Sequence, residues 1–149
     1  MKRDSRLSLA LHLLLHMDGV EAITSESLAR SGQTHPVVMR RTMAGLREAG
    51  IVHSEKGHGG GWTLARPLEK VTLADVYAAL GTPALFALSN RTESPGCLVE
   101  QVVNERLGAA LSEAEQLLLR RFGELSLAEI GKEVQRRCPP QHRHKKRSA

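Results

Sequence analysis

Apolar residues recur at helical spacing in several separate parts of the chain. The first part, residues 5–17 (SRLSLALHLLLHM), has leucine or alanine on most sides and contains neither glycine nor proline. A helix that is apolar nearly all round is buried, so this segment predicts a central helix that ends at Gly19. His12 and His16 have the i, i+4 spacing that can hold a metal. No third ligand stands near them in the sequence, so we expect both rings at the exposed edge of the helix.

Two shorter helices follow, joined by a turn. Thr24 is a favoured N-cap residue for a helix over residues 24–31. Pro36 suits the first position of a second helix, which we expect to run to about residue 49 and to stop at Gly50. The packed face of this second helix is expected at Val38, Thr42 and Leu46, which are spaced by four residues, and at Ala49, which follows.

Two β-prone runs then flank a glycine-rich segment. Residues 51–54 and 62–64 predict strands, and residues 55–61 (EKGHGGG) predict the hairpin turn between them. The glycines do not match a nucleotide-binding loop, because the G-x-G-x-x-G spacing is missing and a strand follows instead of a helix. Two helices, a turn and a β-hairpin form a winged helix-turn-helix, a shape that fits duplex DNA.

The second half of the chain predicts helices again. Thr72 and Asp75 have the spacing of a capping box, which opens a short helix that Gly81 ends. After a proline-containing linker, apolar residues continue at spacings of three, four and seven over residues 98–122. This helix, about 38 Å long, is too long for so small a body to cover, and a second copy is its simplest partner. Two alternatives stay open: the helix folds back on its own domain, or it breaks near Ser112.

The predicted fold class is mainly α with a small β-hairpin: a winged helix-turn-helix followed by a long C-terminal dimerisation helix. Ser126 opens a last helix whose inner face is expected at Leu127, Ile130 and Val134. The predicted division of the chain is a DNA-binding domain at 1–81, a linker at 82–97, dimerisation helices at 98–137 and a disordered basic tail at 138–149.

The net charge of +5 is unevenly distributed. Residues 1–70 contain 10 basic and 7 acidic side chains, whereas residues 71–135 contain 5 basic and 9 acidic ones. The remaining 14 residues hold six Lys or Arg and no acid. The first half and the tail could therefore face phosphates, and the acidic middle could not easily do so.

Several function classes are not favoured. No apolar run approaches the ~18 residues of a membrane span, and the N-terminus does not resemble a secretion signal, so we expect a cytoplasmic protein. Two cysteines, Cys97 and Cys138, are too few for a disulfide framework or a four-cysteine zinc site. No set of base, nucleophile and pocket residues is recognisable, so we do not expect an enzyme.

The chain resembles the Rrf2 family of bacterial winged-helix repressors, the group that includes the IscR, NsrR and CymR regulators. The resemblance rests on SRLSLALHLLLHM, HPVVMRRTMAGLREAGIVHSEKGHGGGWTLARP and VTLADVYAALG, and it extends over about residues 5–135. It implies a dimeric DNA-binding regulator whose recognition helix begins near His35. It also implies that the wing at residues 57–61 contacts the minor groove.

The chain departs from this family in its cysteines. Iron–sulfur members place three cysteines in the loop before the long helix, and this chain has only Cys97 there. A cluster held by thiolates takes about four ligands, so we expect no iron–sulfur cluster and place the chain in a cysteine-poor branch. Cys97 begins a predicted helix, a position that can make a thiol reactive. It is either a redox-sensing thiol or an inert helix-start residue.

The sequence therefore predicts a transcription regulator, a repressor that binds a palindromic operator in double-stranded DNA as a homodimer through the helix at 98–122. The alternative is a winged-helix protein-interaction module without specific DNA binding, which the near-neutral charge of residues 1–135 allows. The residues expected to contact DNA are Thr24 and Ser25 before and in the first short helix, His35, Val37, Arg40 and Arg41 in the second, and Lys56, Gly57, His58 and Gly59 in the wing.

Overall fold

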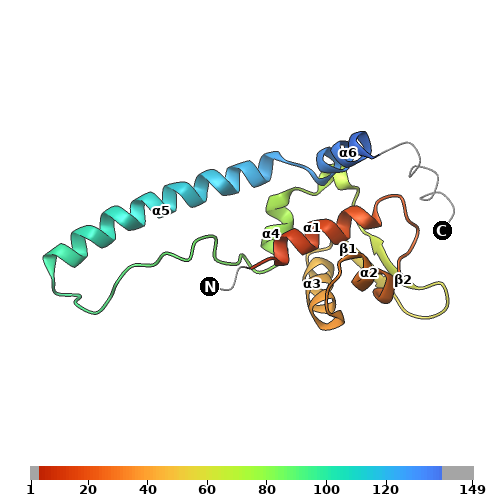
Figure 1. The fold of residues 1–149 in the computed structure, drawn as a ribbon, viewed down its shortest axis with the longest axis horizontal. Coiled ribbons are helices and arrows are strands. Elements are labelled where there is room, and N and C mark those ends of the chain that lie inside the picture. Colours follow the sequence, from red (N-terminus) through yellow and green to blue (C-terminus); the bar gives the residue numbers. More distant parts are fainter. Residues whose placement is uncertain (1–3, 139–149) are drawn as a thin grey trace.

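The computed structural model describes residues 4–138 and has a body of short helices and a hairpin, from which one long helix projects (Figure 1). The predicted mainly-α class with a small β-hairpin is confirmed. The elements are α1 (Arg6–Met17), α2 (Ser25–Ser31), α3 (Pro36–Glu48), β1 (Val52–Glu55), β2 (Gly61–Leu64), a 3-10 turn (Leu68–Lys70), α4 (Leu73–Ala79), α5 (Leu98–Glu124) and α6 (Leu127–Arg137). Most of the predicted tail, residues 139–149, lies outside the described residues.

Helix α1 is the centre of the body, as its apolar pattern predicts. It buries Ala10, Leu13, Leu14 and Met17 in one core with residues of α2, α3, α4, α6 and both strands. His12 and His16 are exposed, and Nε2 of His12 lies 2.9 Å from the carbonyl oxygen of Ser31. Between residues 4 and 138 no group of three or more His, Cys, Asp or Glu side chains could hold a metal.

Of the four residues predicted for the packed face of α3, only Thr42 and Leu46 are buried, and Ala49 is exposed at the C-cap. Its buried residues are Met39, Thr42, Met43 and Leu46. Val38, which we expected in this face, is 41% exposed. The i, i+4, i+7 set that packs is Met39, Met43 and Leu46, because α2 and α1 cover that side of α3. The hydroxyl of Thr42 is satisfied within the helix, where Oγ1 donates to the carbonyl of Val38 at 3.0 Å.

The wing is tied to the segment that precedes α2. β1 and β2 pair antiparallel, with Val52 opposite Leu64 and Glu55 opposite Gly61. The N–H of Trp62 donates to the carbonyl of Ile23 at 2.8 Å, and the N–H of Ile23 donates back to Trp62 at 3.0 Å. A Cβ on Gly61 would lie 2.7 Å from the carbonyl oxygen of Ile23. Gly61 is therefore required by this close approach of two backbones within the protein.

Helix α6 packs on the body although the long helix precedes it. Leu127 is fully buried in the main core, and its N–H donates to the carbonyl of Val71 at 2.9 Å. Capping boxes open α4 at Thr72 and α6 at Ser126, as the sequence predicts. The expected inner face of α6 is only partly right, since Val134 is 51% exposed. The sequence grouped α6 with the long helix, whereas its packing joins it to the N-terminal body.

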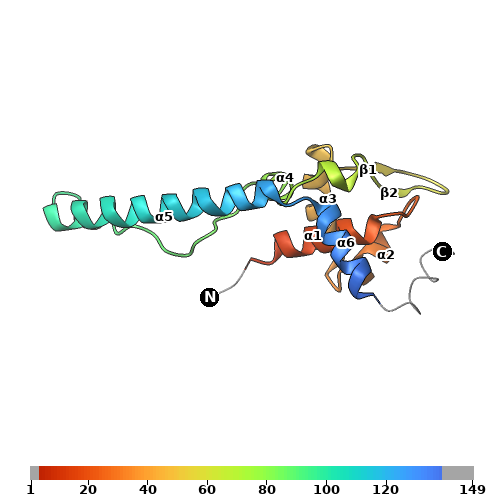
Figure 2. The ribbon, with the colours of Figure 1, turned by 90° about the horizontal axis from the view of Figure 1, so that it is seen from above.

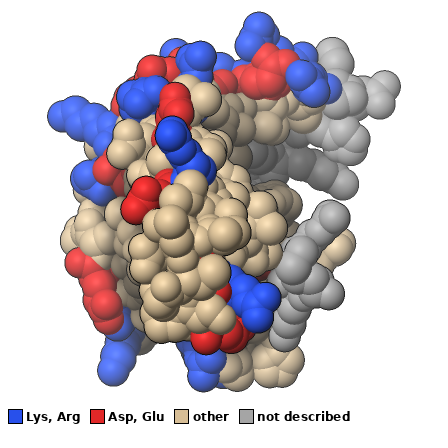
Figure 3. Space-filling model, turned by 90° about the vertical axis from the view of Figure 1, so that its left-hand side faces the viewer, with Lys and Arg blue, Asp and Glu red and all other residues tan. Residues whose placement is uncertain are grey.

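Helix α5 is one unbroken helix of 27 residues, without the break near Ser112 that the sequence left open. The linker leads out from α4 to its far end, and α5 returns to the body (Figures 1 and 2). Near the body, the ring of Phe122 lies edge-on to Tyr77 of α4, with centroids 6.0 Å apart. No residue of α5 is buried. Seen along α5 from its start, the surface is neutral at the centre, with charges of both signs around the edge (Figure 3).

No helix within the described residues is long and apolar enough to span a membrane.

Candidate nucleic-acid interface

The outward face of α3 follows from its buried face. At 100° per residue, the side opposite Met39, Thr42, Met43 and Leu46 carries a ridge of four residues: Val37, Arg41, Ala44 and Glu48. Arg40 lies at one flank of this ridge, toward α2, and Val38 at the other. Val37, Arg40 and Arg41 are all exposed. The predicted contact residues of this helix therefore lie together on its free side, near its N-terminus.

His35 is the N-cap of α3, a role that the sequence did not indicate. Its Nδ1 accepts the N–H of Val37 at 3.2 Å. In this arrangement the ring proton is on Nε2, and only that edge of the ring is free to donate to a ligand. The cap fixes the backbone of the first turn, where Pro36 occupies a position that needs no N–H. His35 consequently both orders the helix start and keeps one donor for contact.

Arg40 and Arg41 have no carboxylate partner among residues 4–138. Nε of Arg40 donates to the carbonyl of Pro36 at 3.3 Å, a bond within its own helix. An ion pair in the neighbouring helix α2 joins Arg30 and Glu26 at 3.9 Å and does not involve either arginine of α3. Both guanidinium groups of α3 therefore keep donors that are available for an anion or a base edge.

The start of α2 presents two hydroxyl groups. Oγ1 of Thr24 accepts the N–H of Ser27 at 3.2 Å as the N-cap, as predicted. Oγ of Ser25 accepts the indole N–H of Trp62 at 2.9 Å. Each hydroxyl uses a lone pair inside the protein and keeps its own proton, so both can donate outward. The Trp62–Ser25 bond joins residues 37 positions apart, and no local sequence pattern could reveal it.

The wing tip is exposed and turns on glycines. Gly57 and Gly59 have φ values of +101° and +79°, and a Cβ on either would meet nothing within 4 Å. Gly60 donates its N–H to the carbonyl of Gly57 at 3.0 Å and closes the turn. Lys56 and His58 are exposed at this tip. Backbone conformation, more than room for a ligand, explains the glycines at Gly57 and Gly59.

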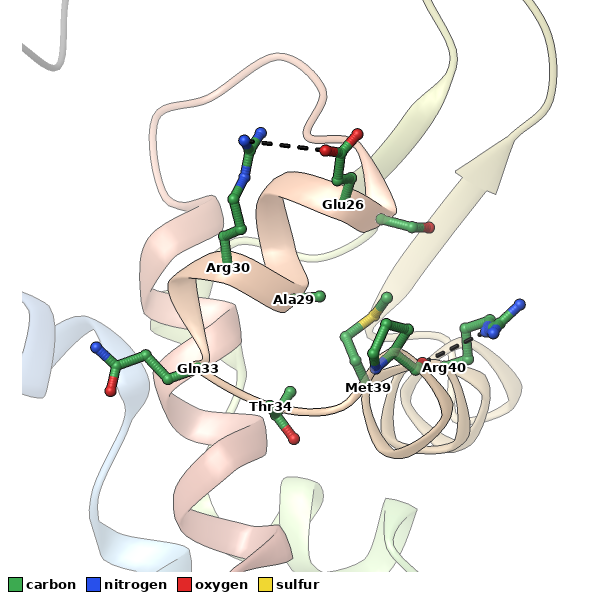
Figure 4. Close-up of a pocket in the computed structure, with 9 residues that line it drawn as sticks. Glu26, Ala29, Arg30, Gln33, Thr34, Met39 and Arg40 are labelled. Atoms are coloured by element: carbon green, nitrogen blue, oxygen red, sulfur yellow. Dashed lines mark hydrogen bonds and ion pairs between the residues drawn. The ribbon is translucent and has the colours of Figure 1, made fainter.

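A groove of about 620 Å³ lies between α2 and the first half of α3 (Figure 4). Met39 and Ala29, both buried, form its apolar floor, and Arg30 and Arg40 stand at its two sides. Ser25 also lines this groove. The groove is therefore lined by one predicted contact from each helix, Ser25 of α2 and Arg40 of α3, and the wing is bonded to Ser25 through Trp62.

The linker is held to the first turns of α5 by side-chain hydrogen bonds. The carboxylate of Glu100 accepts the N–H of Ser94 at 3.1 and 3.2 Å, and Nδ2 of Asn104 donates to the carbonyl of Arg91 at 2.7 Å. Arg91 also approaches Glu100, whose side chain is only 11% exposed. These residues form a polar clasp at the place where cluster-binding members of the resembled family carry cysteines.

The donors near this clasp do not fit an iron–sulfur cluster. Cys97 is the only linker cysteine, is exposed, and caps α5 without a side-chain hydrogen bond. Cys138 lies at the end of α6. A thiolate-held cluster needs about four ligands, and the described residues offer no group that could replace them. A redox role for Cys97 stays a prediction.

Comparisons with known proteins agree with this fold. The family model described as "Rrf2: Iron-dependent Transcriptional regulator" matches residues 3–133. A Bacillus subtilis protein named as an HTH-type transcriptional regulator, YwnA, is 27% identical over 127 residues, which cover 85% of this chain and 95% of the relative.

Two solved structures show the same architecture. A transcriptional regulator from Lactobacillus plantarum superimposes with a TM-score of 0.76 at 20% identity, covering 89% of this chain and 91% of the other. IscR from T. potens superimposes with a TM-score of 0.70 at 17% identity, covering 93% of each chain. At these identities the likeness establishes the fold.

Proposed function

This chain belongs to the Rrf2 family of transcriptional regulators, which are DNA-binding proteins and not enzymes, and we propose that it is a cytoplasmic repressor that binds a palindromic operator as a homodimer. The proposal rests on the presence of two separate exposed surfaces in one chain. One is the exposed side of α3, where neither Arg40 nor Arg41 has a carboxylate partner among the described residues, and the other is a 27-residue helix in which no residue is buried.

The DNA contacts in this proposal come from three elements. α3 enters the major groove with its N-terminal half. The hydroxyl groups of Thr24 and Ser25 donate to backbone phosphates. Lys56 and His58, with the backbone of Gly57 and Gly59, follow the minor groove at the wing. The Ile23–Trp62 pairing supports a concerted contact, because it fixes the wing relative to α2.

The two arginines are assigned different roles. Arg41 lies on the outward ridge and reads a base, because arginine pairs with O6 and N7 of guanine. Arg40 lies at the flank beside α2, has one bond to its own helix, and contacts a phosphate. His35 contributes Nε2 to a neighbouring phosphate or base, since its Nδ1 is engaged in capping.

The homodimer in this proposal forms along α5. Apolar side chains gather on one side of it, and Leu98 and Val99 are 72% and 71% exposed. Most of the stability of helices in proteins comes from the packing of an apolar face, so a second copy that covers the stripe stabilises the helix as well as the dimer. Two-fold symmetry then requires two half-sites whose centres lie about one helical turn apart, or a multiple of it.

The test is a band-shift titration on the DNA upstream of the gene, at several salt concentrations. A repressor binds with an affinity that falls steeply as salt rises, because phosphate contacts release counterions. The same titration with a half-site alone should show much weaker binding. Absence of any salt-dependent shift would reject the proposal and favour the protein-interaction module. Transcription from the bound promoter should decrease when the protein is added.

Variants of α3 separate the two arginines. We expect Arg41→Ala to cost about 1–3 kcal/mol on the operator and to relax selectivity at one base pair. We expect Arg40→Ala to weaken operator and non-operator DNA alike and to lower the salt slope by about 1. Glu69→Gln, exposed in the 3-10 turn and outside both proposed surfaces, is the control and should leave both affinities unchanged. Unchanged operator affinity in both arginine variants would reject the assignment.

A further inference from the structure

The outward ridge of α3 has an apolar residue where solvent would favour a polar one. Val37 is 42% exposed, and it is the first residue of the ridge at the helix start. Its neighbours along the ridge are Arg41, one turn later, and Ala44, about two turns later. Val38 is equally exposed at 41%, but it lies 100° further round the helix, at the flank of the ridge. The pocket between α3 and the end of α4 is lined by Val38 and also by Arg41 and Ala44, but not by Val37.

The chemistry of this ridge matches one combination of bases. In the major groove the only methyl group on a base edge is at C5 of thymine, and aliphatic side chains contact it. Guanine offers the two acceptors that one guanidinium can bind together. Ala44 adds little bulk, so it allows the helix to lie close to the base edges. Val37 and Arg41 therefore present, side by side, partners for a thymine and a guanine.

The spacing of the two side chains limits the distance between the two bases. Residues one turn apart on a helix are separated by about 6 Å along its axis. Successive bases on one strand are about 3.4 Å apart, so this separation corresponds to about two base pairs. Val37 has little freedom to adjust, because the His35 cap holds its N–H and its β-branched side chain has few rotamers in a helix.

We propose that each operator half-site contains a guanine bound by Arg41 and, within two base pairs of it, a thymine whose methyl group packs against Val37. This inference rests on the proposed DNA binding and adds the identity of the bases. It makes Val37 a specificity-determining residue through an apolar contact. Loss of one buried methyl group corresponds to about a fourfold change in affinity.

The experiment begins with duplexes selected from a randomised library by the full-length protein. The thymine nearest the selected guanine is then replaced by uracil, which differs only by the absent methyl group. We expect uracil to weaken binding of the parent protein about fourfold. In Val37→Ala the thymine duplex should bind more weakly, and uracil should then have almost no further effect.

Val38→Ala is the matched control, since it removes the same atoms from an equally exposed valine off the ridge. It should retain the full uracil effect. The proposed contact is overturned if selected sites have no thymine within two base pairs of the guanine. It is also overturned if uracil weakens parent and Val37→Ala equally. Failure to select any duplex would reject DNA binding itself, whereas tight binding with no uracil effect rejects only the contact of Val37.

Discussion

The body and the long helix of this protein use their apolar residues in opposite ways. In the body, a single core joins Leu13 and Leu14 of α1 with residues from both strands and from α2, α3, α4 and α6, all shielded from solvent. Over its 27 residues α5 buries none, although its leucines and valines are as apolar as those of the core. The body completes its own packing, whereas α5 leaves its apolar side chains uncovered in this chain.

The difference assigns different tasks to the two regions. A body with a closed core can hold His35, Arg41 and the wing in fixed positions before DNA arrives, which reduces the conformational entropy lost on binding. A helix with an uncovered stripe gains stability only when a partner covers it. In the proposed homodimer, each recognition surface is therefore prepared within one chain, whereas the pairing of two such surfaces depends on protein concentration.

The largest effect is expected from a residue that lies after the long helix in sequence but within the body in space. Leu127→Ala should lower the free energy of unfolding by about 2–5 kcal/mol, because it leaves a cavity in the main core. Val134→Ala, on the exposed side of the same helix, should change it by less than about 1 kcal/mol. Urea denaturation at fixed protein concentration measures both. Equal stability of the two variants would mean that α6 does not belong to the body.

The next test acts on α5 alone. Val103→Glu places a carboxylate in the exposed apolar stripe, and burying it between two helices is costly. We expect the dissociation constant of the dimer to rise at least about tenfold and operator affinity to fall with it. Ser112→Glu adds the same charge at an exposed position half a turn around α5 from Val103, and it serves as the control. Sedimentation velocity would contradict the dimer interface if both variants behaved like the parent.

The smallest expected effect concerns acid and the start of α6. Hydrogen bonds from the backbone and hydroxyl of Ser126 lower the pKa of Glu129 below its ordinary value of 4.5. This stabilisation is present above pH 4.5, because the folded state holds the ionised carboxylate, and it is lost as the pH falls through the lowered pKa. In Glu129→Gln this contribution to the acid dependence of the melting temperature should be absent. An identical acid profile in both proteins would exclude Glu129 as its source.

Local signals in the sequence predicted most helices and strands correctly. The features that the sequence predicted wrongly depend on packing between distant segments. Thr24, Thr72 and Ser126 begin helices as expected, because capping depends on residues within one turn. The exposure of Val38 could not be inferred in the same way. Its spacing from Thr42 and Leu46 suits a packed face, but the positions of α1 and α2 decide which side is covered.

The candidate interface was predictable in composition but not in its internal bonds. The exposed arginines and the wing glycines lie where the sequence places them. The bond from Trp62 to Ser25 and the capping by His35 depend on distances that only the folded chain defines. Likewise, the partial burial of Glu100 follows from the return of the linker along α5, which its polar sequence did not specify.

The length of α5 makes it a lever. It extends about 40 Å and contacts the body near Phe122. A small rotation of α5 about this contact therefore displaces the far end of the helix by several ångströms. Rotating a 40 Å arm by about 5° moves its end by roughly 3.5 Å, which is the rise of one base pair. In a dimer joined along α5, a tilt this small would shift the spacing of the two recognition helices by a base-pair step. A modest change at the clasp could therefore alter operator fit without disturbing the body.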